Sequence, residues 1–185
     1  MIKTSHHRGF TLIELLVAIA IIALLSSIVM AAVSDARQRA TVSEIAQDFK
    51  TIEKALYLFA DDQGRTEWWN CNGGCEIDGY IFGNDPTIES MVESTGLSAF
   101  LPTTPTGPIG GVYRYDYDGD DFCGGGCWSY QAFNILYYPS AGLVATYGPL
   151  LDEYVDGGDG ACAGKIAWNT TNNWIGYHIS CEGKF

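Results

Sequence analysis

An uncharged apolar stretch near the amino terminus sets the main constraint on how this chain folds. Residues 15–33 contain no Asp, Glu, Lys or Arg, and their only polar side chains are Ser26 and Ser27. At about 1.5 Å of rise per residue, a helix over this stretch and its flanks can cross the roughly 30 Å hydrocarbon core of a membrane. The sequence therefore predicts a long helix whose first half needs lipid, or an equally apolar partner, around it.

A single carboxylate, Glu14, lies at the leading edge of this stretch. An ionised group in an apolar medium loses its hydration, so burying the Glu14 carboxylate there costs free energy unless a partner group binds it. The residues around it read GFTLIE over Gly9–Glu14, after a short polar leader at residues 1–9. This combination resembles the processing and methylation signature of type IV pilins and type II secretion pseudopilins. The resemblance is strong over residues 8–64 and only architectural beyond them.

The resemblance implies how the amino terminus is processed and used. A prepilin peptidase would cut between Gly9 and Phe10, and Phe10 would be N-methylated. Glu14 would then attract the new terminal amine of a neighbouring subunit during assembly. Two other interpretations remain open: an uncleaved single-pass anchor with Glu14 at the membrane interface, and secretory cleavage near Ala36.

The helical pattern continues past the apolar stretch as one apolar stripe. Its members recur three or four residues apart: Val42, Ile45, Phe49, Ile52, Leu56 and Phe59. Polar side chains fill the intervening positions, which is typical of a helix that buries one face against a core. Gly64 supplies a natural stop. We therefore expect one continuous helix from about Phe10 to Asp62, roughly 80 Å long.

Beyond Gly64 the chain becomes rich in Gly, Tyr, Trp and Asp, and helical periodicity largely stops. We predict strands at residues 77–82, 112–117, 128–138, 165–168 and 174–180, and helical segments at 90–100 and 143–154. The predicted class is α+β, with a small antiparallel sheet packed on the amphipathic half of the helix, similar to a pilin headpiece. The predicted organisation is a leader at 1–9, a transmembrane or filament-core helix at 10–33, an amphipathic helix at 34–64 and a globular headpiece at 65–185.

All six cysteines lie after the apolar stretch. An even number on one side of a membrane span suggests disulfides in an oxidising compartment. Cys162 and Cys181 flank the predicted C-terminal hairpin, so we predict that they pair. The other four cysteines are Cys71, Cys75, Cys123 and Cys127. They could form two local bridges, cross-links between the two pairs, or a four-thiolate zinc site.

An acidic loop containing glycine offers a candidate cation site. Oxygen donors at alternate positions suit Ca²⁺, which takes many oxygen ligands, and some major pseudopilins bind calcium in a headpiece loop. The loop departs from the EF-hand pattern in the position of its Gly and in lacking a final Glu, and a solvated acidic turn is the alternative. The predicted ligands are Asp116, Asp118, Asp120 and Asp121. A second, weaker candidate combines Asp156 and Asp159.

Charge and motifs exclude several classes of function. The formal net charge is −12, and loss of the leader removes Lys3 and Arg8 as well, so bulk electrostatic binding of nucleic acid is unfavourable. No nucleophile elbow or phosphate-binding loop occurs. After cleavage His178 would be the single imidazole left. We expect a structural role for His178 and no enzymatic activity.

The favoured hypothesis is a structural subunit of a type IV pilus or a type II secretion pseudopilus, polymerised through its N-terminal helix. The precursor would cross the inner membrane once with its headpiece outside the cytoplasm. The mature form would lie in a filament on the cell surface or in the periplasm. The implied partners are copies of itself, other pilin-like subunits, the prepilin peptidase and the membrane assembly machinery.

The alternative is a membrane-anchored extracytoplasmic module that never polymerises. It would bind a glycan or a surface through exposed aromatic side chains, since the chain is 13% aromatic. Such residues more often fill a core or a subunit interface. The candidates are Trp68, Trp69, Tyr137, Tyr138 and Trp174.

Overall fold

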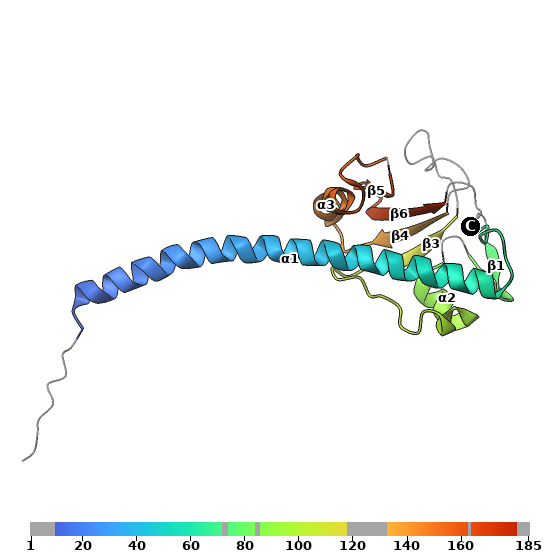
Figure 1. Cartoon of the computed structure of the whole chain (residues 1–185), viewed down its shortest axis with the longest axis horizontal. Coiled ribbons are helices and arrows are strands. Elements are labelled where there is room, and N and C mark those ends of the chain that lie inside the picture. The colour runs from blue at the N-terminus through green and yellow to red at the C-terminus, as the bar shows by residue number, and fades with distance from the viewer. Residues whose placement is uncertain (1–9, 72–73, 84–85, 118–132, 163, 181–185) are drawn as a thin grey trace, which may run out of the picture. The chain divides into compact units, whose positions relative to one another are not determined.

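The computed structural model describes residues 10–71, 74–83, 86–117, 133–162 and 164–180. The chain divides into two compact units, Met1–Arg39 and Ala40–Phe185. Helix α1, Leu12–Asp62, contributes residues to both units (Figure 1). The predicted helix over residues 10–62 is therefore confirmed to within two residues at its start.

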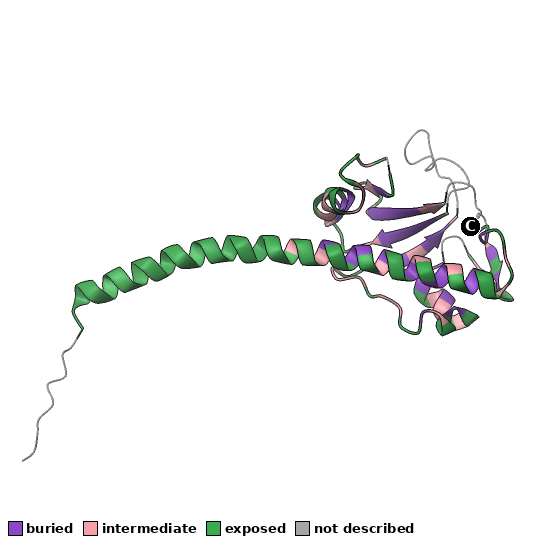
Figure 2. Ribbon diagram, viewed as in Figure 1, coloured by how far each residue is buried: buried purple, intermediate pink, exposed green. Residues whose placement is uncertain are grey.

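The described part of the first unit exposes its apolar side chains. Every residue from Phe10 to Arg37 is exposed, and Figure 2 shows this part of α1 as uniformly exposed. Among the described residues, α1 is the one helix that is long and apolar enough to cross a membrane, judged by its length and composition. Apolar surface of this extent on a soluble monomer is unfavourable in water and indicates an interaction with a membrane or a partner.

The second unit is organised on the amphipathic end of α1. All six residues of the predicted apolar stripe are buried, with exposed fractions of 0–3%, and Figure 2 shows purple bands of buried residues along this part of α1. The helix ends where Gly64 adopts a φ of +64°. The Gly64 amide donates to Asp61 O at 2.9 Å and the Arg65 amide donates to Ala60 O at 3.0 Å, which together cap the last carbonyls. The predicted stop at Gly64 is confirmed.

A four-stranded antiparallel sheet packs on this face of α1. The strands are β3 (Val112–Asp116), β4 (Phe133–Tyr138), β5 (Ile166–Asn169) and β6 (Trp174–Ser180), hydrogen-bonded in the order β3-β4-β6-β5. The predicted strand at 112–117 and the predicted C-terminal hairpin are confirmed. The second predicted strand is present over its last six residues, and residues 128–132 lie outside the described part of the chain.

The single strand predicted over residues 77–82 is wrong. The chain instead forms a two-stranded hairpin of β1 (Cys75–Ile77) and β2 (Tyr80–Phe82). Asp78 and Gly79 lie between the strands with φ values of 52° and 79°. An Asp-Gly pair in this left-handed conformation makes the tight turn that reverses a hairpin. The dipeptide was the available signal for this turn.

Two α-helices and one 3₁₀ turn complete the second unit. Helix α2 is Ile88–Ser94, and the 3₁₀ turn η1 is Gly96–Ala99, so the segment predicted at 90–100 starts earlier and is divided. Thr87 explains the early start because its Oγ1 accepts a hydrogen bond from the Ser90 amide at 3.1 Å. Helix α3, Val144–Asp156, confirms the predicted segment at 143–154 and accommodates Pro149.

Aromatic rings join α1 to the sheet. The Phe49 ring stacks on Tyr177 at 5.2 Å between centroids and meets Tyr113 edge to face at 5.6 Å. The Tyr113 hydroxyl donates to Asp48 Oδ2 at 2.7 Å, and the Tyr177 hydroxyl donates to Glu53 Oε2 at 3.0 Å. The tyrosines therefore bury their rings in the core while their hydroxyl groups reach carboxylates on α1, which satisfies buried polar atoms.

Candidate functional site

The predicted processing and assembly residues lie at the start of α1. Gly9 is outside the described residues, whereas Phe10 is described and its side chain is 86% exposed. Glu14 lies in the first turn of the helix, also exposed. The described residues thus place Phe10 and Glu14 about one helical turn apart on an apolar, solvent-facing segment.

Glu14 and Thr11 form a reciprocal cap at the start of α1. Glu14 Oε2 accepts hydrogen bonds from the Thr11 amide and from Thr11 Oγ1, both at 2.8 Å. The Glu14 amide donates back to Thr11 Oγ1 at 3.3 Å. This is the capping box formed by Thr or Ser followed three residues later by Glu. Thr11 was not among the predicted site residues, although the T-x-x-E spacing indicates a capping box.

The cap leaves part of the Glu14 carboxylate available. Both bonds from Thr11 go to Oε2, and Oε1 makes no hydrogen bond within the described part of the chain. A carboxylate presents two oxygens, and each can accept from a cation. The same side chain can therefore hold its own helix start and also receive an ammonium group from another molecule.

A shallow groove of about 430 Å³ runs along the first turns of α1. Its walls are two rows of residues spaced four apart, namely Phe10, Glu14 and Ala18 in one row and Ile13, Val17 and Ile21 in the other. Rows with this spacing are the ridges and grooves by which helices pack. Glu14 therefore lies among apolar side chains on a face of α1 through which another helix could pack.

The structure shows how two of the six cysteines are paired. Cys71 and Cys75 are bridged to each other, with Cα atoms 4.3 Å apart. This local bridge overturns the two alternatives that used these residues, cross-links to the second pair and a four-thiolate zinc site. Cys123 and Cys127 lie outside the described residues. Cys162 is disulfide-bonded, but Cys181 lies outside the described residues, so their pairing stays a prediction.

The aromatic residues proposed as an adhesion platform lie mainly in the interior. Trp68 and Trp69 are each 2% exposed, Trp174 is 1% exposed and Tyr137 is fully buried. Phe59 stacks on Trp69 at 5.2 Å, and Tyr113 stacks on Tyr137 at 4.5 Å. The predicted platform is therefore wrong, because packing on α1 and within the sheet covers the ring faces that a glycan would need.

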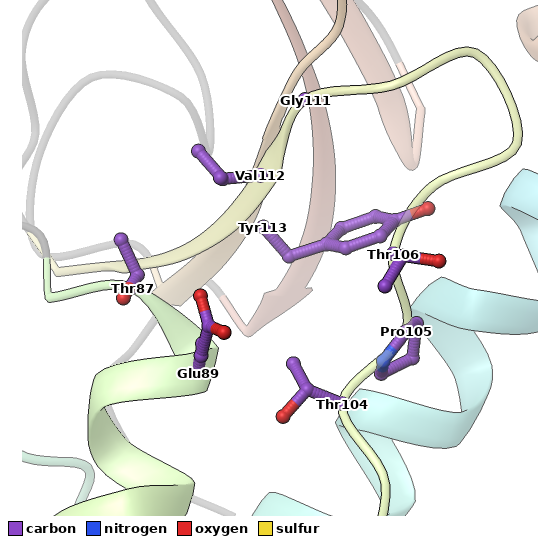
Figure 3. Close-up of a pocket in the computed structure, with 8 residues that line it drawn as sticks. All are labelled: Thr87, Glu89, Thr104, Pro105, Thr106, Gly111, Val112 and Tyr113. Atoms are coloured by element: carbon purple, nitrogen blue, oxygen red, sulfur yellow. The ribbon is translucent and has the colours of Figure 1, made fainter.

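A pocket lies between β3 and the start of α2, as Figure 3 shows. Thr87 and Glu89 line one side, residues 104–106 another, and residues 111–113 of the β3 segment complete it. Its volume is about 100 Å³. Sites for small-molecule ligands usually enclose about 300–1,000 Å³. This pocket is therefore too small for a typical metabolite.

His178 belongs to a buried row of polar side chains that are linked by hydrogen bonds. Its Nδ1 is 2.9 Å from Asn134 Oδ1, and Asn134 Nδ2 donates to Asp116 Oδ2 at 3.3 Å. Because Asn134 Oδ1 can only accept, Nδ1 carries the proton of the neutral ring. Burial and, to a smaller extent, the nearby charge of Lys165 together lower the pKa of His178 to about 4. These contacts favour the expected structural role.

Of the four residues predicted to bind calcium in the acidic loop, the structure describes Asp116 alone. Asp116 is 1% exposed, and its carboxylate accepts the hydrogen bond from Asn134. The other three predicted ligands, Asp118, Asp120 and Asp121, lie outside the described part of the chain. Calcium binding by this loop stays a prediction.

The second candidate cation site, predicted from Asp156 and Asp159, also includes Asp152, which was not predicted. Asp152 lies one helical turn before Asp156 on α3, and one carboxylate oxygen from each of Asp152, Asp156 and Asp159 lies within 4.8 Å of the others. Burial raises the pKa of Asp152 to about 6, and the nearby charges of Asp156 and Asp159 act in the same direction. The i, i+4 spacing on a helix was the available signal for Asp152.

Comparisons with known proteins agree with the resemblance at the amino terminus. A family model described as the prokaryotic N-terminal methylation motif matches residues 4–30. The prepilin peptidase-dependent protein D of Escherichia coli (strain K12) is 40% identical over 67 residues, which are 36% of this chain and 44% of that protein. The match thus spans less than half of that relative's length.

A second relative matches over a longer region. The type II secretion system core protein G of Escherichia coli (strain K12) is 26% identical over 113 residues, which are 61% of this chain and 74% of that protein. No solved structure matches the chain. The resemblance drawn from Gly9–Glu14 is confirmed by these matches.

Proposed function

We propose that this chain, a pilin-like protein with a prepilin-type N-terminal methylation motif, is a structural subunit of a type II secretion pseudopilus or a related type IV pilus. The observation that carries the proposal is the exposed apolar start of α1, with Glu14 as its one carboxylate. A surface of this kind requires lipid before assembly and other helices after it.

Processing would prepare the helix for assembly. Similarity to a protein named for its dependence on prepilin peptidase supports cleavage between Gly9 and Phe10. Because Thr11 and Glu14 both follow this bond, the cut would leave the capping box intact. The same cut would create a positively charged amine at Phe10, close to the face of α1 that carries Glu14.

Assembly would then pair opposite charges inside an apolar bundle. A lone carboxylate among packed helices is costly, whereas a carboxylate that accepts from a neighbour's ammonium group offsets much of its lost hydration. Small side chains along the helix allow close packing in an apolar medium. These residues are Ala18, Ala20, Ala23, Ser26 and Ser27. The implied partners are copies of this chain and other pilin-like subunits.

Two substitutions at Glu14 test this proposal and separate charge from capping. Glu14→Ala removes both functions, whereas Glu14→Gln keeps an oxygen that can cap Thr11 and removes only the charge. Both variants should be cleaved normally, as judged by the mass of the amino-terminal peptide. Both should enter filaments, whether sheared from the cell surface or recovered from the periplasm, at a strongly reduced level.

The control is Glu44→Gln, which removes an exposed acid from the second half of the same helix. It should be incorporated as well as the parent chain. Normal incorporation of Glu14→Gln together with failure of Glu14→Ala would assign Glu14 to capping alone and contradict the charge pairing.

A further inference from the structure

The amphipathic part of α1 carries two neighbouring positive charges on an acidic molecule. Lys50 and Lys54 are both exposed. They are four residues apart, so they share one face of the helix and are separated by about 6 Å along its axis. The chain has a formal net charge of −12. These two residues, the α1 lysine pair, therefore form a small cationic surface on the second unit.

The α1 lysine pair has no partner within the described part of the chain, where neither ammonium group makes an ion pair, a hydrogen bond or a ring contact. Other cations of the second unit are engaged. Arg65 Nε donates to Glu67 O at 3.0 Å, and the Lys165 ammonium group lies 5.3 Å from the centre of the Tyr177 ring. Like charges one helical turn apart repel each other, so the pair destabilises its own helix until a negative partner is near.

Helix α2 presents the complementary feature. Glu89 and Glu93 are also four residues apart, and both are exposed. Neither carboxylate makes an ion pair or a hydrogen bond among the described residues. Other acids with this spacing on the described helices are engaged, since Asp48 accepts from Tyr113, and Asp152 and Asp156 accept from backbone amides. Glu89 and Glu93, the α2 glutamate pair, are therefore the matching surface for two lysines one turn apart.

The pocket beside β3 gives the glutamate pair a seat for a cationic side chain. Figure 3 shows Glu89 lining this pocket together with the threonines at 87, 104 and 106. Its volume of about 100 Å³ equals the share of roughly three water molecules in liquid water. This space is too small for a metabolite, but it accommodates an ammonium group with its last methylene groups. Hydroxyl and carboxylate oxygens are the acceptors that an ammonium group needs.

From these features we infer that the α1 lysine pair of one copy of the chain binds the α2 glutamate pair of a second copy, with one ammonium group seated against Glu89 in the pocket beside β3. The inference rests on the proposed filament and names a contact between its second units. Because both pairs have the same one-turn spacing, two ion pairs can form together between the helices.

This contact would give the assembly a direction. The lysine pair and the glutamate pair are different surfaces of the same unit, so the contact is heterologous, and each added copy leaves one of each pair available. Heterologous contacts that do not close into a ring produce helical filaments. Exposed ion pairs contribute little stability individually. Their effect is to set the register between copies, while the apolar start of α1 supplies most of the burial.

Paired charge reversals in the full-length chain test the contact. Lys50→Glu with Lys54→Glu, or Glu89→Lys with Glu93→Lys, places like charges opposite each other, so each double variant should enter isolated filaments about tenfold less than the parent. Combining all four changes restores opposite charges with exchanged polarity, so this quadruple variant should recover most of the parent level. Unchanged incorporation of both double variants, or no recovery in the quadruple variant, would overturn the inference.

A matched quadruple variant separates the contact from net charge. It combines the two lysine reversals with Glu76→Lys and Glu153→Lys, which change exposed acids on β1 and α3. Its net charge equals that of the parent, but the new lysines lie outside the α2 glutamate pair. It should therefore remain about tenfold reduced. Recovery to the level of the first quadruple variant would assign the effect to net charge and overturn the inference.

Cross-linking of parent filaments gives an answer that does not depend on how any variant folds. A carbodiimide joins an amine to a carboxylate that is already in contact with it. Mass spectrometry of the cross-linked dimer should identify a peptide that joins Lys50 or Lys54 to Glu89 or Glu93. Dimers in which the lysine pair is joined only to other acids would overturn the inference.

These results are separable from the filament proposal. Filaments that contain the chain cleaved before Phe10, and that tolerate every charge reversal, would keep the proposed function and remove this contact. A parent chain that never enters filaments would overturn both.

Discussion

Glu14 and His178 show how single polar side chains are accommodated in this molecule. Glu14 divides its carboxylate between a cap on its own helix and an oxygen left free for another molecule. His178 is held neutral by burial and by the nearby charge of Lys165, and its Nδ1 contacts Asn134 Oδ1. The first residue is poised for a partner outside the chain, and the second is satisfied within it.

His178 makes the stability of the fold depend on pH. Its pKa falls from 6.5 to about 4 in the folded chain, so below pH 6.5 the unfolded chain binds a proton that the folded chain resists. Stability from this group is therefore complete above pH 6.5 and is lost as the pH falls to about 4. His178→Gln cannot acquire the charge, so its stability should fall less over this range, as measured by chemical denaturation at several pH values. Parallel pH profiles for the two chains would contradict the assignment.

At the scale of elements, close packing of α3 on β5 depends on Gly148. A Cβ atom at this position would lie 2.5 Å from Trp168 Cγ and 2.9 Å from Trp168 Cβ. Gly148→Ala should cost about 1–3 kcal/mol through overpacking, partly offset by better helix propensity. The thermal midpoint should fall by roughly 2–4 °C per net kcal/mol.

Gly83→Ala is the matched control for this substitution. A Cβ atom at Gly83 would meet nothing within 4 Å. Its midpoint should change little, because exposed substitutions usually alter stability by less than about 0.5 kcal/mol. An equal loss in both variants would show that Gly148 is not a packing contact.

The Cys71–Cys75 bridge stabilises the segment before β1. The loop it closes is short, so the chain-entropy estimate of its contribution is about 2 kcal/mol. Replacing both residues with Ala should lower the free energy of unfolding by about this amount, as measured by chemical denaturation. A double variant as stable as the parent would show that packing of Trp69 and its neighbours holds this segment without the bridge.

The elements were more predictable from sequence than the polar clusters. The stripe from Val42 to Phe59 predicted the buried face of α1, because helical periodicity records burial directly. The β1–β2 hairpin was missed because its reversal depends on two residues, Asp78 and Gly79, inside a short apolar segment. Asp152 was missed because its meeting with Asp159 depends on how the chain turns after α3, which periodicity does not encode.

At the scale of the whole molecule, the two units meet different physical requirements. The described part of Met1–Arg39 exposes its apolar residues, whereas Ala40–Phe185 encloses a hydrophobic core built from α1, the sheet and α3. The second unit buries its own apolar residues, whereas the described part of the first unit needs an apolar environment from lipid or from another molecule. The proposed filament provides that environment through neighbouring copies of the same segment.

The amino terminus of the chain found in isolated filaments, whether sheared from the cell surface or recovered from the periplasm, tests the central claim most directly. Mass spectrometry of that fraction should identify a first peptide that begins with N-methylated Phe10, because the account requires cleavage after Gly9 and assembly of the cleaved form. A chain that is absent from fibres and recovered with Met1 still attached would contradict the account and would favour an anchor that never polymerises.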